Sequence, residues 1–249
     1  MKVSIVIPVY NEEKTVGILL DRVWKAKIPG VKKEIIIVES NSSDKSRGIV
    51  KRFVKNKRGV RLILENKPEG KGTAVRRGFK EASGDIILIQ DADLEYDVRD
   101  YEKLIRPIIE GKTLFVLGSR HLDFNGGNKW KIRNFKGKER LYASFMNWGG
   151  ILLHTLFNIL YGTKLTDPTT MYKVFHKKLL EEVNFVGKYF ELDFEIVAKF
   201  VRLGYIPLEI PIKYKSRGNS EGKKVKLSRD VLKWLMTIIK FRFIPISAI

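Results

Sequence analysis

The sequence predicts an α/β fold in which helices flank a mostly parallel central sheet. Short runs rich in Val and Ile alternate with stretches whose apolar residues recur at helical spacing, and this alternation is typical of βαβ units. Polar clusters directly follow three of these runs, as in parallel sheets that bind ligands at the carboxyl ends of their strands. The 249 residues, 44% of them apolar, are enough to bury the core of one domain.

The elements follow one another in a regular order. Strands are predicted at residues 3–9, 34–38, 60–64, 86–90 and 114–117, and helical spacing is clearest at residues 15–27 and 44–55. Residues 121–137 are rich in Gly, Asn and Lys and have too little periodicity for a regular element, so we expect a loop there. Residues 141–160 are largely apolar, but polar residues and a Gly-Gly pair interrupt them, and we do not expect them to span a membrane.

The composition narrows the class of protein. Lys and Arg number 48 and Asp and Glu 28, so the formal charge is +20 and a negatively charged partner is expected: nucleic acid, anionic lipid or a phosphate-bearing substrate. The absence of cysteine excludes disulfides, thiolate metal sites and cysteine nucleophiles, and with the high lysine content it favours a thermophile. Residues 1–10 lack the cleavage site of a signal peptide, so we expect the domain to face the cytosol.

Two aspartates close the fourth predicted strand. Asp91 and Asp93 project to the same side, because side chains alternate along a strand. Two carboxylates so close repel each other unless a cation or several donors neutralise them. Oxygen ligands with room for a phosphate suit Mg²⁺ or Mn²⁺, which predicts a metal that bridges the protein and a diphosphate. The alternative is a solvated turn in which Asp93 caps a helix.

A glycine-flanked lysine, Gly70-Lys71-Gly72, precedes a helical stretch after the third predicted strand. Backbone N–H groups and the helix dipole favour an anion at such a position. The spacing is not that of a Walker loop, so the motif has meaning only beside the others.

Together these motifs resemble those of the family 2 glycosyltransferases. That family carries Pro-x-Tyr/Phe-Asn-Glu, an acidic Ser-rich turn, a glycine-rich Asn-x-Gly-x-Gly-x-Ala segment and Asp-x-Asp at its strand ends; the corresponding residues here are 8–12, 39–44, 66–74 and 91–93. In the carboxyl half the chain looks most like the dolichyl-phosphate mannose synthases and related polyprenyl-phosphate sugar transferases. That likeness rests on Gly118-Ser119-Arg120, on Arg140 and Ser144, on residues 166–170, and on residues 217–220 with Lys223, and it extends over residues 1–226.

The resemblance implies a glycosyltransferase A-type, Rossmann-like fold. It also implies inverting transfer of a hexose from a nucleotide-diphosphate sugar, of the GDP-mannose or UDP-glucose type, to a polyprenyl (dolichyl) phosphate. It places the nucleotide-sugar site at Pro8, Tyr10, Glu12, Glu39, Gly70, Lys71, Asp91, Ala92 and Asp93. It places Mg²⁺ or Mn²⁺ at Asp91, Asp93 and Glu95, the acceptor phosphate at Arg120, Arg140, Ser144, Arg217 and Lys223, and catalysis at Asp91, Asp93 and Arg217.

Three positions depart from the family pattern. Glu39-Ser40 stands where an Asp-Asp pair is usual, Met171 stands where Gly is common, and Glu95 stands where the mannose synthases often carry Gln. The donor's base and sugar therefore stay open between the guanosine and uridine types.

The acceptor decides whether a base is needed. A phosphate monoester is already anionic at neutral pH and requires cations, and Arg binds phosphate with a fork of donors. A hydroxyl on a glycan or lipid requires a base, for which Glu195 is the candidate. The alternative for Glu195 is an ion pair with Lys199, four residues further along a helix. A basic nucleic-acid-binding protein is a third reading, but the sequence shows no aromatic stacking platform, and no nucleic-acid partner is expected.

The end of the chain differs in character from the rest. We expect residues 1–222 to form the catalytic domain and residues 223–249 a basic amphipathic tail, in which residues 227–240 form a helix with one apolar face. Such a helix either docks on the sheet or lies on an anionic membrane, which would place the enzyme peripherally on its cytoplasmic face. His121, His154 and His176 are interpreted as structural or surface residues. Oligomeric state, and whether Ile249 is the natural end, stay open.

Overall fold

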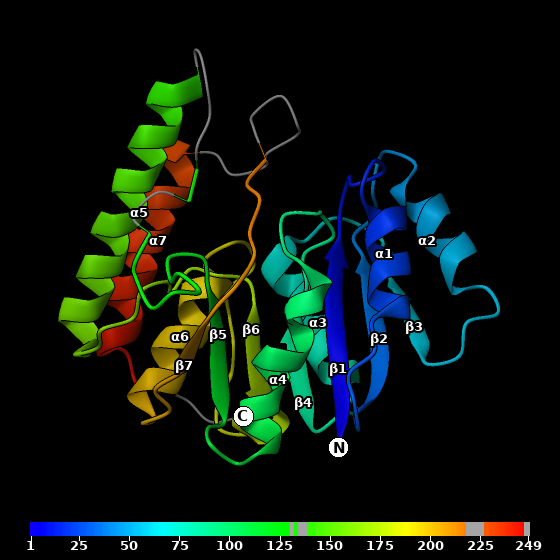
Figure 1. The fold of residues 1–249 in the computed structure, drawn as a ribbon. Helices are drawn as coiled ribbons and strands as arrows, with labels where there is room; N and C mark the ends of the chain where they lie inside the picture. Colours follow the sequence, from blue (N-terminus) through cyan, green and yellow to red (C-terminus); the bar gives the residue numbers. More distant parts are fainter. Residues whose placement is uncertain (130–131, 134–138, 218–226, 247–249) are drawn as a thin grey trace.

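The computed structural model describes residues 1–129, 132–133, 139–217 and 227–246, and it confirms the α/β prediction. A seven-stranded sheet in the order β3-β2-β1-β4-β6-β5-β7 runs through the molecule with helices packed against it (Figure 1). The strands are β1 (Lys2–Val9), β2 (Lys32–Glu39), β3 (Val60–Leu64), β4 (Ile86–Ile89), β5 (Phe115–Ser119), β6 (Lys173–His176) and β7 (Leu208–Pro211). The helices are α1 (Val16–Lys25), α2 (Ser46–Val54), α3 (Lys71–Glu81), α4 (Tyr101–Ile109), α5 (Glu139–Tyr161), α6 (Leu192–Arg202) and α7 (Leu227–Phe243), with 3₁₀ turns η1 (Val98–Asp100) and η2 (Lys177–Leu180).

The pairing of the strands sets where a site can form. β1 pairs in parallel with β2 and β4, β2 with β3, and β5 with β7. The carboxyl ends of β1, β2 and β4 therefore meet at one edge, as the sequence predicts. β6 runs antiparallel to β4 and β5. Neither β6 nor β7 was predicted, because each has only four residues and no long β-branched run marks it.

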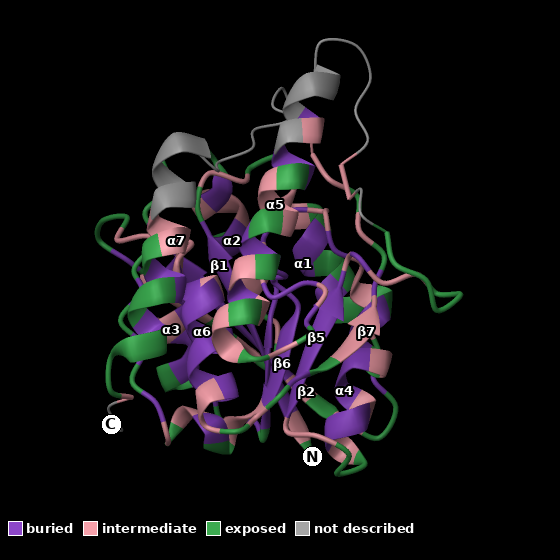
Figure 2. Ribbon diagram, turned by 90° about the vertical axis from the view of Figure 1, so that its left-hand side faces the viewer, coloured by how far each residue is buried: buried purple, intermediate pink, exposed green. Residues whose placement is uncertain are grey.

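The core lies on the strands and on the faces that the helices turn toward them. The central strands are buried along most of their length (Figure 2). Gly78 of α3 lies directly against Val6 of β1, and a Cβ at this position would clash with the Val6 side chain. This close approach seats α3 on the sheet, and it thereby fixes Lys71 at the first turn of the helix.

The two long helices α5 and α7 stand side by side next to α6 (Figure 1). On α7, Ile238 and Phe241 are buried, whereas Met236 and Ile239 are exposed. One face of the tail helix thus packs against α6 and α5, whereas the docked alternative placed it on the sheet; its outer face keeps exposed apolar side chains. In the part of the chain that the structure describes, no helix is both long enough and apolar enough to cross a membrane.

Candidate active site

A cavity of about 960 Å³ lies at the edge of the sheet where β1 and β4 end. Its walls come from the segments after these strands, from the starts of α3 and α6, and from α5 and α7. Most of the residues predicted from the sequence line it: Pro8, Tyr10, Glu12, Gly70, Lys71, Asp91, Ala92, Asp93, Glu95, Arg120 and Arg217. Chain segments that are far apart in the sequence are therefore brought to one place by the topology.

Three predicted residues whose side chains the structure describes are not part of this lining. Glu39, Ser144 and Glu195 are described but do not reach the cavity wall. The side chain of Arg140 and the whole of Lys223 lie outside the described residues.

Glu39 has a structural place instead of the predicted one at the cavity wall. It is fully buried; its Oε1 accepts a hydrogen bond from the Ser42 main-chain N at 2.8 Å, and its Oε2 accepts one from Arg47 Nε at 2.5 Å. Because one oxygen bonds the turn after β2 and the other bonds the first turn of α2, Glu39 holds the turn and the helix together. The adjacent Ser40 lines the cavity.

The two aspartates after β4 lie beside two cations. Lys71 Nζ is 2.6 Å from Asp91 Oδ1, and an Arg217 guanidinium nitrogen is 2.7 Å from Asp93 Oδ2. Burial, together with the charges of Asp91 and Glu95, raises the pKa of Asp93 to about 7. This crowding of carboxylates is the arrangement that the sequence predicts at the end of β4.

Asp93 is not a helix cap. Its Oδ1 accepts from the Glu95 main-chain N at 3.0 Å, which closes a short turn. The next helical turn is η1, and its cap is Asp97, whose side chain accepts from the Arg99 N. The capping alternative for Asp93 is therefore wrong, because the chain turns before any helix begins.

Lys71 begins α3 beside a tight loop contact. Gly70 has φ +98°, a left-handed conformation that favours glycine, and a Cβ there would clash with the Lys188 carbonyl. Burial opposes the charge of Lys71, but Asp91 and Asp193 hold its pKa above the usual value, so Lys71 stays cationic at the cavity wall.

Arg120 is held by a network under the cavity wall. Its Nε and one terminal nitrogen bond the two oxygens of Asp167, each at 2.7 Å, and the terminal nitrogen also donates to Thr169 Oγ1 at 2.8 Å. Asp167 is fully buried and satisfied by this bidentate pair. The guanidinium is 5.2 Å from the centre of the Tyr214 ring. Asp167 lies in the 166–170 segment that carries the family resemblance, but the sequence predicts no role for it.

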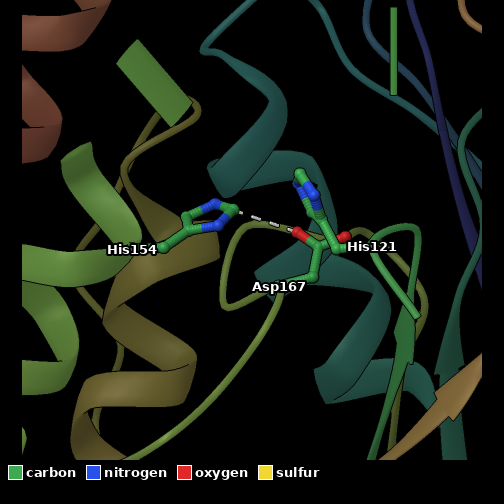
Figure 3. Close-up of side chains that lie close together, drawn as sticks. All are labelled: His121, His154 and Asp167. Carbon is green, nitrogen blue, oxygen red and sulfur yellow. Dashed lines mark ion pairs between the residues drawn. The ribbon is translucent and has the colours of Figure 1, made fainter. Parts of the chain in front are cut away.

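The histidines were interpreted as structural or surface residues, and the structure shows that two of them, His121 and His154, are buried next to each other. His121 and His154 lie together with Asp167, with ligand-type atoms within 4.8 Å of one another (Figure 3). The three residues are far apart in the sequence, so spacing gave no sign of the cluster. His154 Nε2 is 3.0 Å from Thr169 Oγ1, and His121 Nδ1 is 2.7 Å from the Lys129 carbonyl.

Burial lowers the pKa of His154 to about 4, which leaves this ring neutral at pH 7. Since both Asp167 oxygens already bond Arg120, the cluster acts as a support for that guanidinium.

Glu195 does not face the cavity. It is fully buried; its carboxylate accepts from the main-chain N of Val186 at 2.9 Å and of Gly187 at 2.6 Å, and it lies 2.8 Å from Lys199 Nζ. The ion pair with Lys199 is confirmed. The role of Glu195 as a base is not supported, because its oxygens are engaged in the interior.

Asp193, two residues earlier on α6, lines the cavity and was missed. Burial raises its pKa against the opposing charges of Lys71 and Lys173. Residues two apart on a helix lie on nearly opposite sides, so the acidic run alone could not show which carboxylate faces inward.

Comparisons with known proteins show which family the chain resembles in sequence. The family model described as "Glycosyl transferase family 2" matches residues 4–183. The dolichol-phosphate mannosyltransferase of Pyrococcus furiosus is 29% identical over 258 residues, which covers 100% of this chain and 70% of that protein. The dolichyl-phosphate beta-glucosyltransferase ALG5A of Trichomonas vaginalis is 27% identical over 253 residues, covering 95% of this chain and 72% of that protein.

Solved structures show the same fold. The glucosyl-3-phosphoglycerate synthase from Mycobacterium tuberculosis, in complex with Mn²⁺, uridine diphosphate and glucosyl-3-phosphoglycerate, has a TM-score of 0.69 at 20% sequence identity, covering 99% of this chain and 81% of that chain. The expected glycosyltransferase A-type fold is thereby confirmed.

Proposed function

The chain belongs to glycosyl transferase family 2, and we propose that it transfers a hexose, with inversion, from a nucleotide-diphosphate sugar to a polyprenyl phosphate at a membrane surface. The donor is of the GDP-mannose or UDP-glucose type. One observation carries the proposal. The carboxylates after β4 and Arg120, which the buried Asp167 holds in place, line a single cavity. The wall that α5 and α7 add to this cavity is largely apolar. The carboxylates suit a metal-bound sugar diphosphate, the arginine suits a phosphate, and the apolar wall suits a hydrocarbon chain.

The carboxylates fit a divalent cation. Asp91, Asp93 and Glu95 offer oxygen ligands only, and Asp91 and Asp93 each already draw a cationic side chain to within ion-pair distance. These three residues would hold Mg²⁺ or Mn²⁺. Such an ion supplies stabilisation of the negative charge that builds on the leaving diphosphate.

We assign the donor side of the cavity to the segments that follow β1 and β2 and to the start of α3. Pro8 near the end of β1, Tyr10 directly after β1 and Ser40 directly after β2 line it, and Gly70 and Lys71 line it at the start of α3. The ammonium of Lys71 and the amino end of α3 both favour phosphate oxygens. These groups orient the diphosphate before transfer and neutralise it during transfer.

The acceptor side favours a phosphate. Arg120 and Arg217 line the same cavity, and an Arg fork matches a phosphate group. A phosphate oxygen attacks the anomeric carbon without a base, and the attack from the opposite face inverts that carbon. The hydroxyl-acceptor alternative loses its proposed base, since Glu195 is engaged inside the protein.

The apolar wall suits the lipid part of the acceptor. Leu153 of α5 and Trp234 and Leu235 of α7 line the cavity, and away from the cavity the two helices expose Ile159 (73%) and Phe243 (73%). Exposed apolar side chains next to basic ones favour an anionic membrane surface. We place the enzyme peripherally on the cytoplasmic face, with residues 1–222 as the catalytic domain and residues 223–249 as the membrane-contacting tail.

The proposal is tested by transfer. The protein is incubated with radiolabelled GDP-mannose or UDP-glucose, Mn²⁺ and a short-chain polyprenyl phosphate, and the label is followed into organic solvent. A lipid-linked sugar with inverted configuration is expected from one donor. Release of free sugar alone, from every donor and with lipid phosphate present, would contradict it.

A further inference from the structure

We infer that Arg217 is an internal counter-ion of the acidic cluster, and that a divalent cation has to displace it from Asp93 and Glu95, which frees Arg217 for a phosphate in the same cavity. The inference rests on the proposed function, because it concerns the same metal and the same acceptor.

One guanidinium lies among three carboxylates. Its nitrogens are 3.0 Å from Glu12 Oε2 and 2.7 Å from Asp93 Oδ2, and its Nε is 3.9 Å from Glu95 Oε1. The pairs are only partly exposed, so solvent screens them less than it screens a surface pair. Arg217 is thus placed where it neutralises the cluster most directly.

A metal and Arg217 need the same oxygens. Asp93 Oδ1 is engaged by the Glu95 main-chain N, and Asp93 Oδ2 is engaged by Arg217. A divalent ion on Asp93 Oδ2 would lie within a few ångströms of the guanidinium, where two positive charges repel strongly. Occupancy by one cation therefore disfavours the other.

Glu95 holds residues 214–217 next to the acidic cluster. Its Oε1 accepts from the Arg217 main-chain N at 2.6 Å, its Oε2 accepts from the Tyr214 hydroxyl at 2.9 Å, and its carbonyl accepts from the Lys215 N at 2.9 Å. If Glu95 turns toward a metal, the two side-chain tethers of residues 214–217 are lost together. Release of Arg217 is then a motion of the segment as well as of one side chain.

The same segment reaches the acceptor side. Tyr214 packs under Arg120, the arginine held by Asp167, so residues 214–217 connect the acidic cluster with the phosphate-binding side of the cavity. A released Arg217 presents its fork of donors to a phosphate beside Arg120. The consequence is an order of binding: metal and donor first, acceptor phosphate second.

The test measures Mn²⁺ affinity without any substrate. Free Mn²⁺ is followed by its electron paramagnetic resonance signal for the wild type, R217Q and K215Q, each checked for folding by thermal melting. Lys215 is the matched control: it carries the same charge in the same segment, it is exposed, and its ammonium makes no ion pair with any residue that the structure describes.

R217Q is expected to bind Mn²⁺ at least about tenfold more tightly than the wild type, and K215Q to stay within about threefold, because only the first removes the competing cation. R217K, which keeps the charge but loses the fork, should fall between them. Equal or weaker binding by R217Q, or equal tightening by K215Q, would overturn the inference.

Hydrogen exchange gives a second reading in the wild type. Adding Mn²⁺ should speed exchange of the Arg217 main-chain N–H, since Glu95 no longer accepts from it; slower or unchanged exchange would count against release. Failure here is separable from failure of the proposed function. If the wild type makes lipid-linked sugar but R217Q does not bind Mn²⁺ more tightly than the wild type, only the counter-ion inference is overturned. If the wild type binds no Mn²⁺, both the inference and the proposed function are overturned.

Discussion

The two edges of the sheet hold carboxylates in opposite conditions. At the amino edge, Glu34 is buried, but its oxygens accept from Ser4 Oγ at 2.5 Å, from the Ser83 N at 2.8 Å and from Lys2 Nζ at 2.7 Å. Although burial opposes it, these bonds lower the pKa of Glu34 to about 2. At the carboxyl edge, burial and the neighbouring carboxylates raise the pKa of Asp93 to about 7.

The difference separates stability from function. A carboxylate with donors on each oxygen favours the folded state, whereas carboxylates crowded together disfavour it unless a cation is present. At the amino edge, donors from the chain itself satisfy the Glu34 carboxylate. At the carboxyl edge, the crowded carboxylates favour binding of a further cation, which a metal-bound substrate can supply.

The largest effect is expected when one of the crowded carboxylates at the carboxyl edge is removed. D93N should reduce sugar transfer by about 10³-fold, or roughly 4 kcal/mol, because the leaving diphosphate loses its cation. Initial rates at saturating donor measure the loss. E34Q at the opposite edge serves as the control and should keep transfer within a few-fold; a D93N enzyme as active as E34Q would show that the cluster is not the reacting centre.

The next largest effect is expected on the acceptor side. R120K keeps the charge beside Asp167 but loses the bidentate fork, so kcat/KM for polyprenyl phosphate should fall by about 10- to 100-fold. R106K, in an exposed pair with Glu102, is the matched change and should have little effect. Equal kinetics for R120K and the wild type would remove Arg120 from the acceptor site.

The amino edge makes a prediction about stability. E34Q should lower the free energy of unfolding at pH 7 by about 1–3 kcal/mol, because Lys2 and Ser83 lose a charged acceptor. The folded pKa of Glu34 lies below its unfolded value, so this stabilisation is present above about pH 4.5 and is lost as the pH falls toward 2.

Urea unfolding of the wild type and E34Q across this range measures the effect, and the two curves should converge at the acid end. E81Q, in an exposed pair with Arg61, is the control. Curves that stay parallel down to pH 2 would show that Glu34 is not the group responsible.

Glu195 lies on the same helix as the cavity-lining Asp193, yet its carboxylate is satisfied within the protein as that of Glu34 is. Its oxygens accept main-chain bonds and pair with Lys199, so E195Q should lower the melting temperature while transfer per folded molecule stays within about tenfold. Rates normalised to folded protein test this. Abolished transfer would restore the hydroxyl-acceptor alternative.

The sequence was sufficient where a pattern is local. The parallel strands, the aspartates at the end of β4 and Lys71 at the start of α3 all follow from alternation and position, and the structure brings them to one cavity. It was insufficient where partners come from distant segments. The Asp167 support of Arg120, the His121 and His154 cluster and the inward turn of Glu39 depend on tertiary contacts that no spacing encodes.

The same limit applies to the acidic start of α6. Asp193 and Glu195 are both acidic residues in the first turn of α6, so the sequence does not distinguish them. Only the packing of the helix decides that Asp193 lines the cavity and that Glu195 pairs with Lys199. The short strands β6 and β7 were missed for a related reason, since four residues become a strand only when neighbouring strands supply their hydrogen bonds.

The central claim is that Asp91 and Asp93 seat a divalent cation that holds the donor's diphosphate. Crystals soaked with Mn²⁺ and GDP or UDP test it most directly, through the anomalous scattering of manganese. We predict one strong peak in contact with Asp93 and with diphosphate oxygens, and Arg217 moved away from that carboxylate. A diphosphate bound with no manganese beside it, and with Asp91 and Asp93 still paired to Lys71 and Arg217, would contradict the account.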